Sequence, residues 1–79
     1  MTPDSETKLQ AIFRAVFELP ADAAVTGTRS GVTKGWDSLA TVSLVAAIES
    51  EFGLSLDADE MLRVNSYSAT VELLEELGA

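Results

Sequence analysis

Ser38, in the tripeptide Asp37-Ser38-Leu39, is the side chain of this sequence best placed to do chemistry. It stands where a glycine-containing segment meets the start of an amphipathic pattern, so its hydroxyl is expected at the N-terminus of a helix. Serine is common at that position as an ordinary helix cap. A functional role for Ser38 therefore depends on what surrounds it.

Histidine and cysteine are both absent from the 79 residues. Their absence excludes thiol nucleophiles, disulfides, zinc sites built from Cys and His, and serine hydrolases that use imidazole as the base. A hydrolase based on Ser38 lacks its base, so we expect a protein that is not an enzyme and has no metal site.

Two further motifs are better explained without a ligand. The segment 27–34 resembles a phosphate-binding loop, but its lysine does not follow the second glycine and no strand precedes it. Asp57 and Asp59 resemble the start of a calcium loop, but Leu62 replaces the required glycine and Ser68 the final glutamate. Helix capping explains these aspartates better, since Asp57 fits the cap and Glu60 the N3 position of a capping box. Thr2 or Asp4 is expected to cap the first helix, and Asn65 or Ser66 the last.

The formal charge of −8 comes from 13 acidic and 5 basic residues. This charge repels nucleic acid and anionic lipid, and it favours partners with basic docking patches. Charged residues interrupt the first twenty positions, so neither a signal peptide nor a membrane span is expected. With 47% apolar residues, we expect one domain over residues 1–79. The expected absence of a signal peptide and a membrane span favours a cytoplasmic location. We also expect a monomer, and the start at Met1 favours a free-standing chain over a domain cut from a large synthase.

Apolar spacing predicts an all-α fold, a four-helix bundle with a long loop between helices one and two and a short third helix. The helices are expected over 4–18, 38–52, from Asp57 to about Val64, and from Tyr67 to Gly78. The predicted anchors of the loop are Val25, Val32 and Trp36. The predicted core positions of the helices are Leu9, Ile12, Phe13, Val16, Phe17, Thr41, Leu44, Val45, Ile48, Phe52, Tyr67, Thr70, Val71, Leu74 and Leu77.

The helix after Ser38 carries a second apolar stripe, formed by Leu39, Val42 and Ala46. This stripe lies about 135° from the core face on a helix of 100° per residue. An exposed apolar stripe usually marks a binding surface, so we expect these residues, with Glu49 at the rim, to contact partners. The alternative is that the loop 20–36 covers the stripe.

The chain resembles the acyl carrier protein family through Gly35-Trp36-Asp37-Ser38-Leu39, Thr41-Val42-x-Leu44-Val45 and Ile48-Glu49-x-Glu51-Phe52-Gly53. The resemblance extends over nearly the whole length. It implies that Ser38 bears 4′-phosphopantetheine, with Asp37 and Leu39 as its immediate neighbours. A phosphodiester there would face the positive end of the helix dipole, and Asp37 would cap the helix and leave the Ser38 hydroxyl free.

The resemblance implies a non-catalytic carrier of acyl or aminoacyl thioesters. Its partners would be a phosphopantetheinyl transferase, an acyl- or aminoacyl-loading ligase and downstream transferases or synthases. Ala40 and Ser43 stand where fatty-acid carriers often have acidic residues, and Trp36 is more typical of specialised pathways, so a polyketide, lipid or aminoacyl pathway is expected. The alternative is an unmodified helical module that docks a partner helix on the second stripe.

Overall fold

The computed structural model describes residues 1–29, 31, 33 and 35–79. Within them the chain forms four helices and a single isolated bridge between Arg29 and Ser66, which confirms the predicted all-α bundle. The predicted anchor Val32 lies outside the described residues. The helices are α1 (Pro3–Val16), α2 (Ser38–Phe52), α3 (Ala58–Leu62) and α4 (Tyr67–Glu76).

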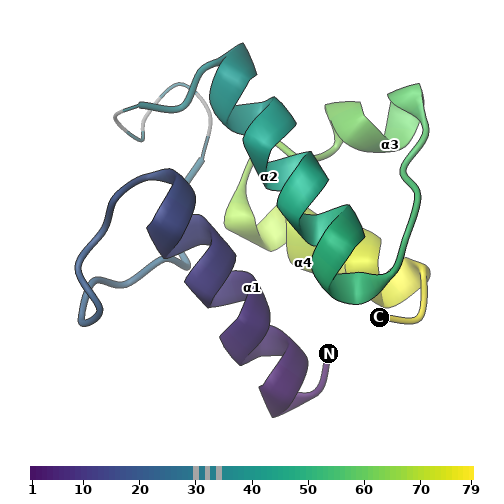
Figure 1. Ribbon diagram of the computed structural model, residues 1–79, viewed down its shortest axis with the longest axis horizontal. Helices are drawn as coiled ribbons and strands as arrows, with labels where there is room; N and C mark the ends of the chain where they lie inside the picture. The colour runs from purple at the N-terminus through teal and green to yellow at the C-terminus, as the bar shows by residue number, and fades with distance from the viewer. Residues whose placement is uncertain (30, 32, 34) are drawn as a thin grey trace.

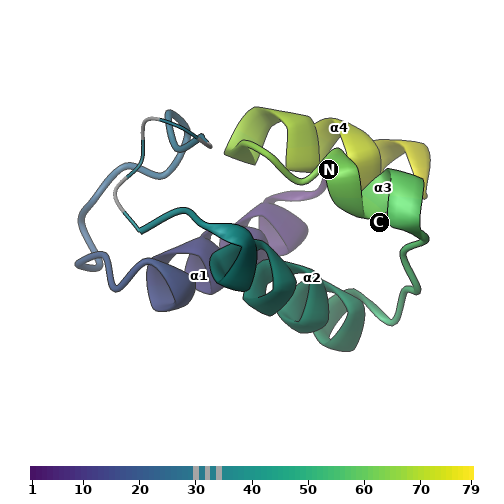
Figure 2. The same cartoon turned by 90° about the horizontal axis from the view of Figure 1, so that it is seen from above.

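The helices form two layers. Helices α1 and α2 lie side by side, and α4 lies behind α2 (Figure 1). Viewed from above, α4 and the short α3 form the opposite layer, and the two termini lie close together (Figure 2). Among the described residues, no helix has the length and apolar character needed to span a bilayer.

Each helix begins at a capping side chain, in agreement with the sequence. The side chains of Thr2, Asp37, Asp57 and Ser66 accept backbone N–H groups at 2.8–3.1 Å. Asp57 and Glu60 form the predicted reciprocal capping box at α3. Ser66 rather than Asn65 caps α4.

The predicted end of the first helix was two residues too late. Glu18 adopts a left-handed conformation with φ 54°, and the Leu19 N–H donates to the Arg14 carbonyl at 2.8 Å. This pattern closes α1 with a Schellman turn, in which glycine is the usual left-handed residue. Sequence reasoning assigned the stop to Pro20, but the backbone turns two residues earlier.

The left-handed Glu18 yields a stability prediction. Because a Cβ atom is unfavourable there, Glu18→Gly should raise the free energy of unfolding by about 0.5–1 kcal/mol, or the melting temperature by about 4 °C. Glu18→Gln removes the charge and keeps the Cβ, so it should give a smaller increase. Thermal melts followed by circular dichroism compare the two variants. An equal gain in melting temperature would show that the lost charge, and not the left-handed backbone, causes the stabilisation.

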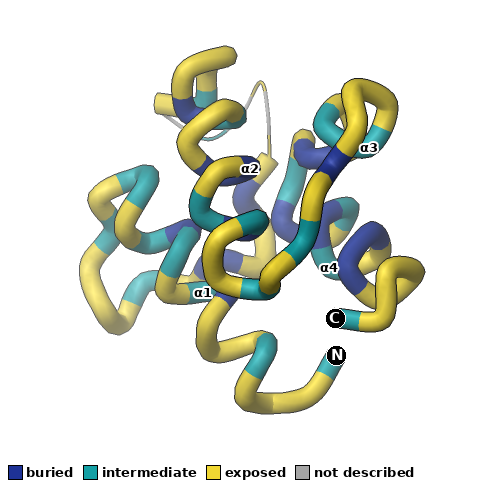
Figure 3. Tube along the Cα trace, turned by 45° about the vertical axis from the view of Figure 1, so that its right-hand side comes forward, coloured by how far each residue is buried: buried dark blue, intermediate teal, exposed yellow. Residues whose placement is uncertain are grey.

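The core lies between the two layers. The dark blue stretches of α1, α2 and α4 in Figure 3 face one another across it. Six of the fifteen predicted helix positions are fully buried, Val45 and Tyr67 are nearly so, and six others are only half-buried: Ile12, Val16, Phe17, Thr41, Phe52 and Val71. The prediction of Leu77 is wrong, because it is 37% exposed and follows the last residue of α4, whereas Leu73 packs inward beside Leu74. Core residues at most 1% exposed are Leu9, Phe13, Val25, Leu44, Ile48, Val64, Thr70, Leu73 and Leu74.

The loop between α1 and α2 is attached to the bundle along its first half. Val25 is 1% exposed and confirms the predicted anchor. The Arg14 guanidinium donates to the Ala23 carbonyl at 3.1 Å, and the Tyr67 N–H donates to the Thr28 carbonyl at 3.0 Å. The loop is therefore held by both α1 and the start of α4.

Acidic side chains outnumber basic ones on the surface. Arg63, the capping residue at the end of α3, forms an ion pair with Glu76 on α4. The hydrogen bond between them raises the pKa of Arg63 and lowers the pKa of Glu76. Lys8 lies 3.6 Å from Asp4 on α1. Both pairs are exposed, so salt screens them.

The charge excess predicts that salt stabilises the fold. The molecule measures 27 × 26 × 18 Å, and the Debye length falls from about 30 Å at about 0.01 M salt to about 10 Å at about 0.1 M. Repulsion across the whole molecule is therefore screened mainly between those concentrations. Melting temperatures at neutral pH should rise over that range, and a flat or falling midpoint would contradict the prediction.

Candidate functional site

Ser38 is the first residue of α2, and its side chain is exposed. The cap is supplied by its neighbour, because the Asp37 Oδ1 accepts the Ala40 N–H at 2.8 Å. The interpretation of Ser38 as an ordinary cap is therefore wrong, and the expected capping role of Asp37 is confirmed. The Ser38 hydroxyl stands at the positive end of a 15-residue helix.

Trp36 fixes the segment that leads into Ser38. Its ring packs against Phe17, with centroids 4.9 Å apart, and edge-on against Phe13 at 5.8 Å. Its Nε1 donates to the Thr41 hydroxyl at 3.1 Å, and that hydroxyl donates to the Asp37 carbonyl at 3.2 Å. The predicted anchor thus connects α1 to the first turn of α2.

The second stripe of α2 is exposed beside Ser38. Leu39 is 74% and Val42 54% exposed, and Ala46 is also exposed. The alternative that loop 20–36 covers these side chains is therefore wrong. Helical spacing places Leu39, Val42, Ala46 and Glu49 on one face, and Ser38 lies at the edge of that face.

Glu49 has a contact that its sequence position did not reveal. Its Oε2 accepts the Leu56 N–H at 2.8 Å, and the residue is half-buried. The carboxylate therefore holds the segment between α2 and α3 against the bundle. The prediction that Glu49 is a rim residue of a partner surface remains a prediction.

An opening of about 240 Å³ lies next to Ser38. Gly35, Asp37, Leu39, Ala40, Ser43 and Val16 line it. A larger groove of about 410 Å³ follows the seam between α1 and α2, and it shares Val16 with the first. Open space therefore lies on this side of the N-terminus of α2.

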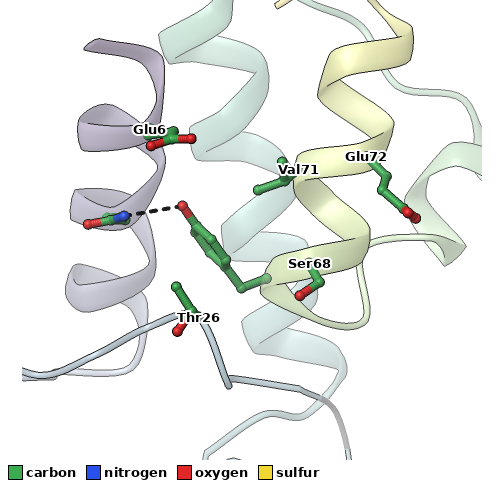
Figure 4. Close-up of a pocket in the computed structure, with 7 residues that line it drawn as sticks. Glu6, Thr26, Ser68, Val71 and Glu72 are labelled. Carbon is green, nitrogen blue, oxygen red and sulfur yellow. Dashed lines mark hydrogen bonds between the residues drawn. The ribbon is translucent and has the colours of Figure 1, made fainter. Parts of the chain in front are cut away.

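A third pocket, of about 320 Å³, lies between α1 and α4 (Figure 4). Gln10 and Tyr67 both line this pocket, and the Gln10 Nε2 donates a hydrogen bond to the Tyr67 hydroxyl at 3.4 Å. Glu6 and Glu72 stand on opposite walls, and none of the lining residues belongs to α2. This pocket is separate from the opening beside Ser38. In the described part of the chain, no three acidic side chains converge as a metal site would require.

The comparisons with known proteins agree with this geometry. Residues 7–74, which include Ser38, match the family model described as "Phosphopantetheine attachment site". The chain belongs to the acyl carrier protein family. The predicted family and cofactor are thereby confirmed, and a member of this family is a carrier rather than an enzyme.

Several curated relatives are acyl carrier proteins of plants. The chain is 35% identical to "Acyl carrier protein 1, chloroplastic" of Casuarina glauca, 31% identical to the protein of that name from Cuphea lanceolata, and 31% identical to "Acyl carrier protein 2, chloroplastic" of Spinacia oleracea. These matches cover 95% of this chain and 55%, 54% and 58% of the relatives. The chain therefore spans about half the length of these relatives.

The residues around Ser38 fit the 4′-phosphopantetheine group of this family. The exposed hydroxyl can form a phosphodiester, and the first N–H groups of α2 lie where they favour its negative charge. The Asp37 carboxylate would repel that charge, but its bond to Ala40 turns it toward the backbone. The neighbouring opening leaves room for the first atoms of the arm.

The capping role of Asp37 can be tested by stability. Asp37→Ala should lower the free energy of unfolding by about 1 kcal/mol, because the Ala40 N–H loses its acceptor. For a domain of this size the melting temperature should fall by about 4–8 °C. Asp37→Asn keeps a capping oxygen and should remain near wild type, and an equal loss in both variants would exclude the cap as the cause.

Proposed function

We propose that this chain carries an acyl group as a thioester on a 4′-phosphopantetheine arm attached to Ser38. The observation that carries the proposal is the exposed Ser38 hydroxyl at the head of α2, freed from capping by Asp37, within a region that matches the attachment-site family. The arm supplies the thiol, which a chain without cysteine cannot provide.

The proposed modification transfers the phosphopantetheinyl group of coenzyme A to the Ser38 hydroxyl. A phosphopantetheinyl transferase directs the Ser38 Oγ onto the phosphorus next to pantetheine, so an Oγ–P bond forms and the P–O–P bond breaks. Adenosine 3′,5′-bisphosphate leaves, and a base on the transferase takes the hydroxyl proton. The backbone N–H groups of α2 stabilise the resulting single negative charge.

Further partners and the cargo follow from the same proposal. A loading ligase attaches the acyl group, and downstream transferases or synthases receive it while the chain acts as a monomer. The names of the relatives, all acyl carrier proteins, favour an acyl over an aminoacyl cargo. A cytoplasmic location stays a prediction, since those relatives are named as chloroplastic.

A specialised pathway is proposed because neither Ala40 nor Ser43 is an acidic residue. Ala40 is buried and Ser43 lines the opening beside Ser38. The first two turns of α2, residues 38–45, contain no acidic side chain. Trp36 supports the assignment less strongly, because its contacts with Phe13 and Phe17 explain its presence by packing alone.

The attachment site is tested with coenzyme A and a broad-specificity phosphopantetheinyl transferase. Intact-mass analysis should show one added phosphopantetheinyl group on the wild type and none on Ser38→Ala. The formal charge should change from −8 to about −9, which native electrophoresis detects independently.

Two control measurements accompany the attachment assay. Ser50→Ala, which changes an exposed serine near the other end of the same helix, should be modified like the wild type. Ser38→Ala should keep the helical circular dichroism spectrum, because Asp37 provides the cap. Modification of Ser38→Ala would overturn the proposed site, and a wild type that is never modified would favour the unmodified interaction module.

A further inference from the structure

A groove follows the outer seam between α1 and α2, the two helices that lie side by side in Figure 1. It lies on a different side of α2 from the exposed stripe, because Ala47 stands about 100° around the helix from Ala46. The volume of the groove is about 410 Å³. Its middle is aliphatic, and the residues that line it there are Ala11, Ile12, Ala15, Val16 and Ala47.

Small side chains keep this seam open. Ala11 and Ala15 are exposed one helical turn apart on α1, and Ala47 is half-buried on α2. None of the three alanines has side-chain atoms beyond Cβ, so Ile12 and Val16 stay partly exposed beside them. Aliphatic surface of this kind gains free energy when an aliphatic group covers it.

The groove adjoins the opening beside Ser38. Val16 lines both spaces, and Gly35, Leu39 and Ser43 are among the other residues that line the opening. A group attached to the Ser38 hydroxyl can therefore enter the groove over the N-terminal end of α2, without passing between the side chains of the core.

The length of the arm matches the distance from Ser38 to the middle of the groove. Ala47 follows Ser38 by nine residues, which places it about 14 Å along α2 and on the opposite side of the helix. With about 10 Å for crossing the helix, the direct path is about 17 Å. An extended 4′-phosphopantetheine arm is about as long as five residues of extended peptide, or about 17 Å. The thioester at its end therefore reaches the groove.

In the part of the chain that the structure describes, the core is filled by its own side chains. Leu44, Ile48, Leu73 and Leu74 are at most 1% exposed and belong to one packed cluster. A chain can enter an interior packed at native density only by displacing such side chains. The groove accepts the same chain without that displacement.

We propose that the acyl chain carried on Ser38 lies in the groove between α1 and α2, on the outside of the bundle, against Ala11, Ala15 and Ala47. This inference rests on the proposed attachment at Ser38, and it adds the chemical class of the cargo. An unbranched aliphatic chain matches the aliphatic lining. An aminoacyl group would instead bring an ammonium group against that lining and lose part of its hydration.

The melting temperatures of chains loaded with a short and a longer acyl group test this inference. A broad-specificity phosphopantetheinyl transferase attaches the whole acyl-phosphopantetheine group from acetyl- or octanoyl-coenzyme A, and intact mass confirms the loading. The octanoyl form should melt about 4 °C or more above the acetyl form, because the groove covers the methylene groups only in the folded chain.

Variants that fill the groove locate the effect. Ala15→Leu and Ala47→Leu should each reduce the difference in melting temperature to about 1 °C or less, since the leucine side chain occupies the space of the acyl chain. Ala58→Leu makes the same substitution at an exposed position of α3 and should keep the full difference. Circular dichroism of the unloaded variants checks that each keeps its helices.

Methyl NMR spectra of the loaded wild type locate the acyl chain directly. Between the acetyl and octanoyl forms, the methyl resonances of Ala11, Ala15 and Ala47 should shift, whereas those of Leu73 and Leu74 should stay in place. This measurement needs no variant, so it decides the question even where a leucine variant fails to fold.

The outcomes separate this inference from the proposed function. A wild type that the transferase cannot load would overturn the attachment at Ser38 itself. Equal melting of the two loaded forms, a difference that survives both groove variants or is also lost in Ala58→Leu, or methyl shifts at Leu73 and Leu74 would overturn the groove alone. A gain with chain length that only the groove variants abolish, with shifts at the three alanines, supports the inference.

Discussion

The packing of aromatic rings around Phe13 is the interaction on which the rest of the structure depends. Phe13 is fully buried on α1, and its ring lies 5.2 Å from that of Tyr67 on α4 and 5.8 Å from that of Trp36. These edge-on contacts join three segments that are distant in sequence. The Trp36 ring also holds the first turn of α2 in place, because its Nε1 donates a hydrogen bond to the Thr41 hydroxyl. The position of Ser38 is thus set by a residue 25 positions earlier, on a different helix.

Helix α2 has apolar side chains on two faces, one buried in the core and one exposed to solvent. Leu44 and Ile48 are fully buried against the other helices, whereas Leu39 and Val42 face outward next to Ser38. A helix that is apolar on two sides gives a weak amphipathic signal, although it packs on one side only. The outer side is exposed to solvent. The same helix therefore contributes to the core and exposes Ser38 with the apolar stripe beside it.

Charge and exposed apolar surface are distributed differently over this molecule. The net charge of −8 gives a long-range field that is screened within about 10 Å at 0.1 M salt. The exposed stripe of Leu39, Val42 and Ala46 beside Ser38 carries no charge, whereas Asp37 directly precedes Ser38. The acidic groups lie mostly on α3, α4 and the loops.

The sequence by itself determined the helices, their caps and the place of Ser38, because periodicity and capping are local interactions between residues a few positions apart. Asp37 and Asp57 could be recognised as caps for that reason, whereas Thr2 and Ser66 were each one of two candidates, beside Asp4 and Asn65. The tertiary structure decided the contacts between distant segments. Leu73 rather than Leu77 is buried in the core, and the Glu49 carboxylate accepts the Leu56 N–H. The Trp36 ring packs against Phe13 and Phe17. Burial and long-range hydrogen bonds are set by how the helices pack against one another, and no local pattern contains that information.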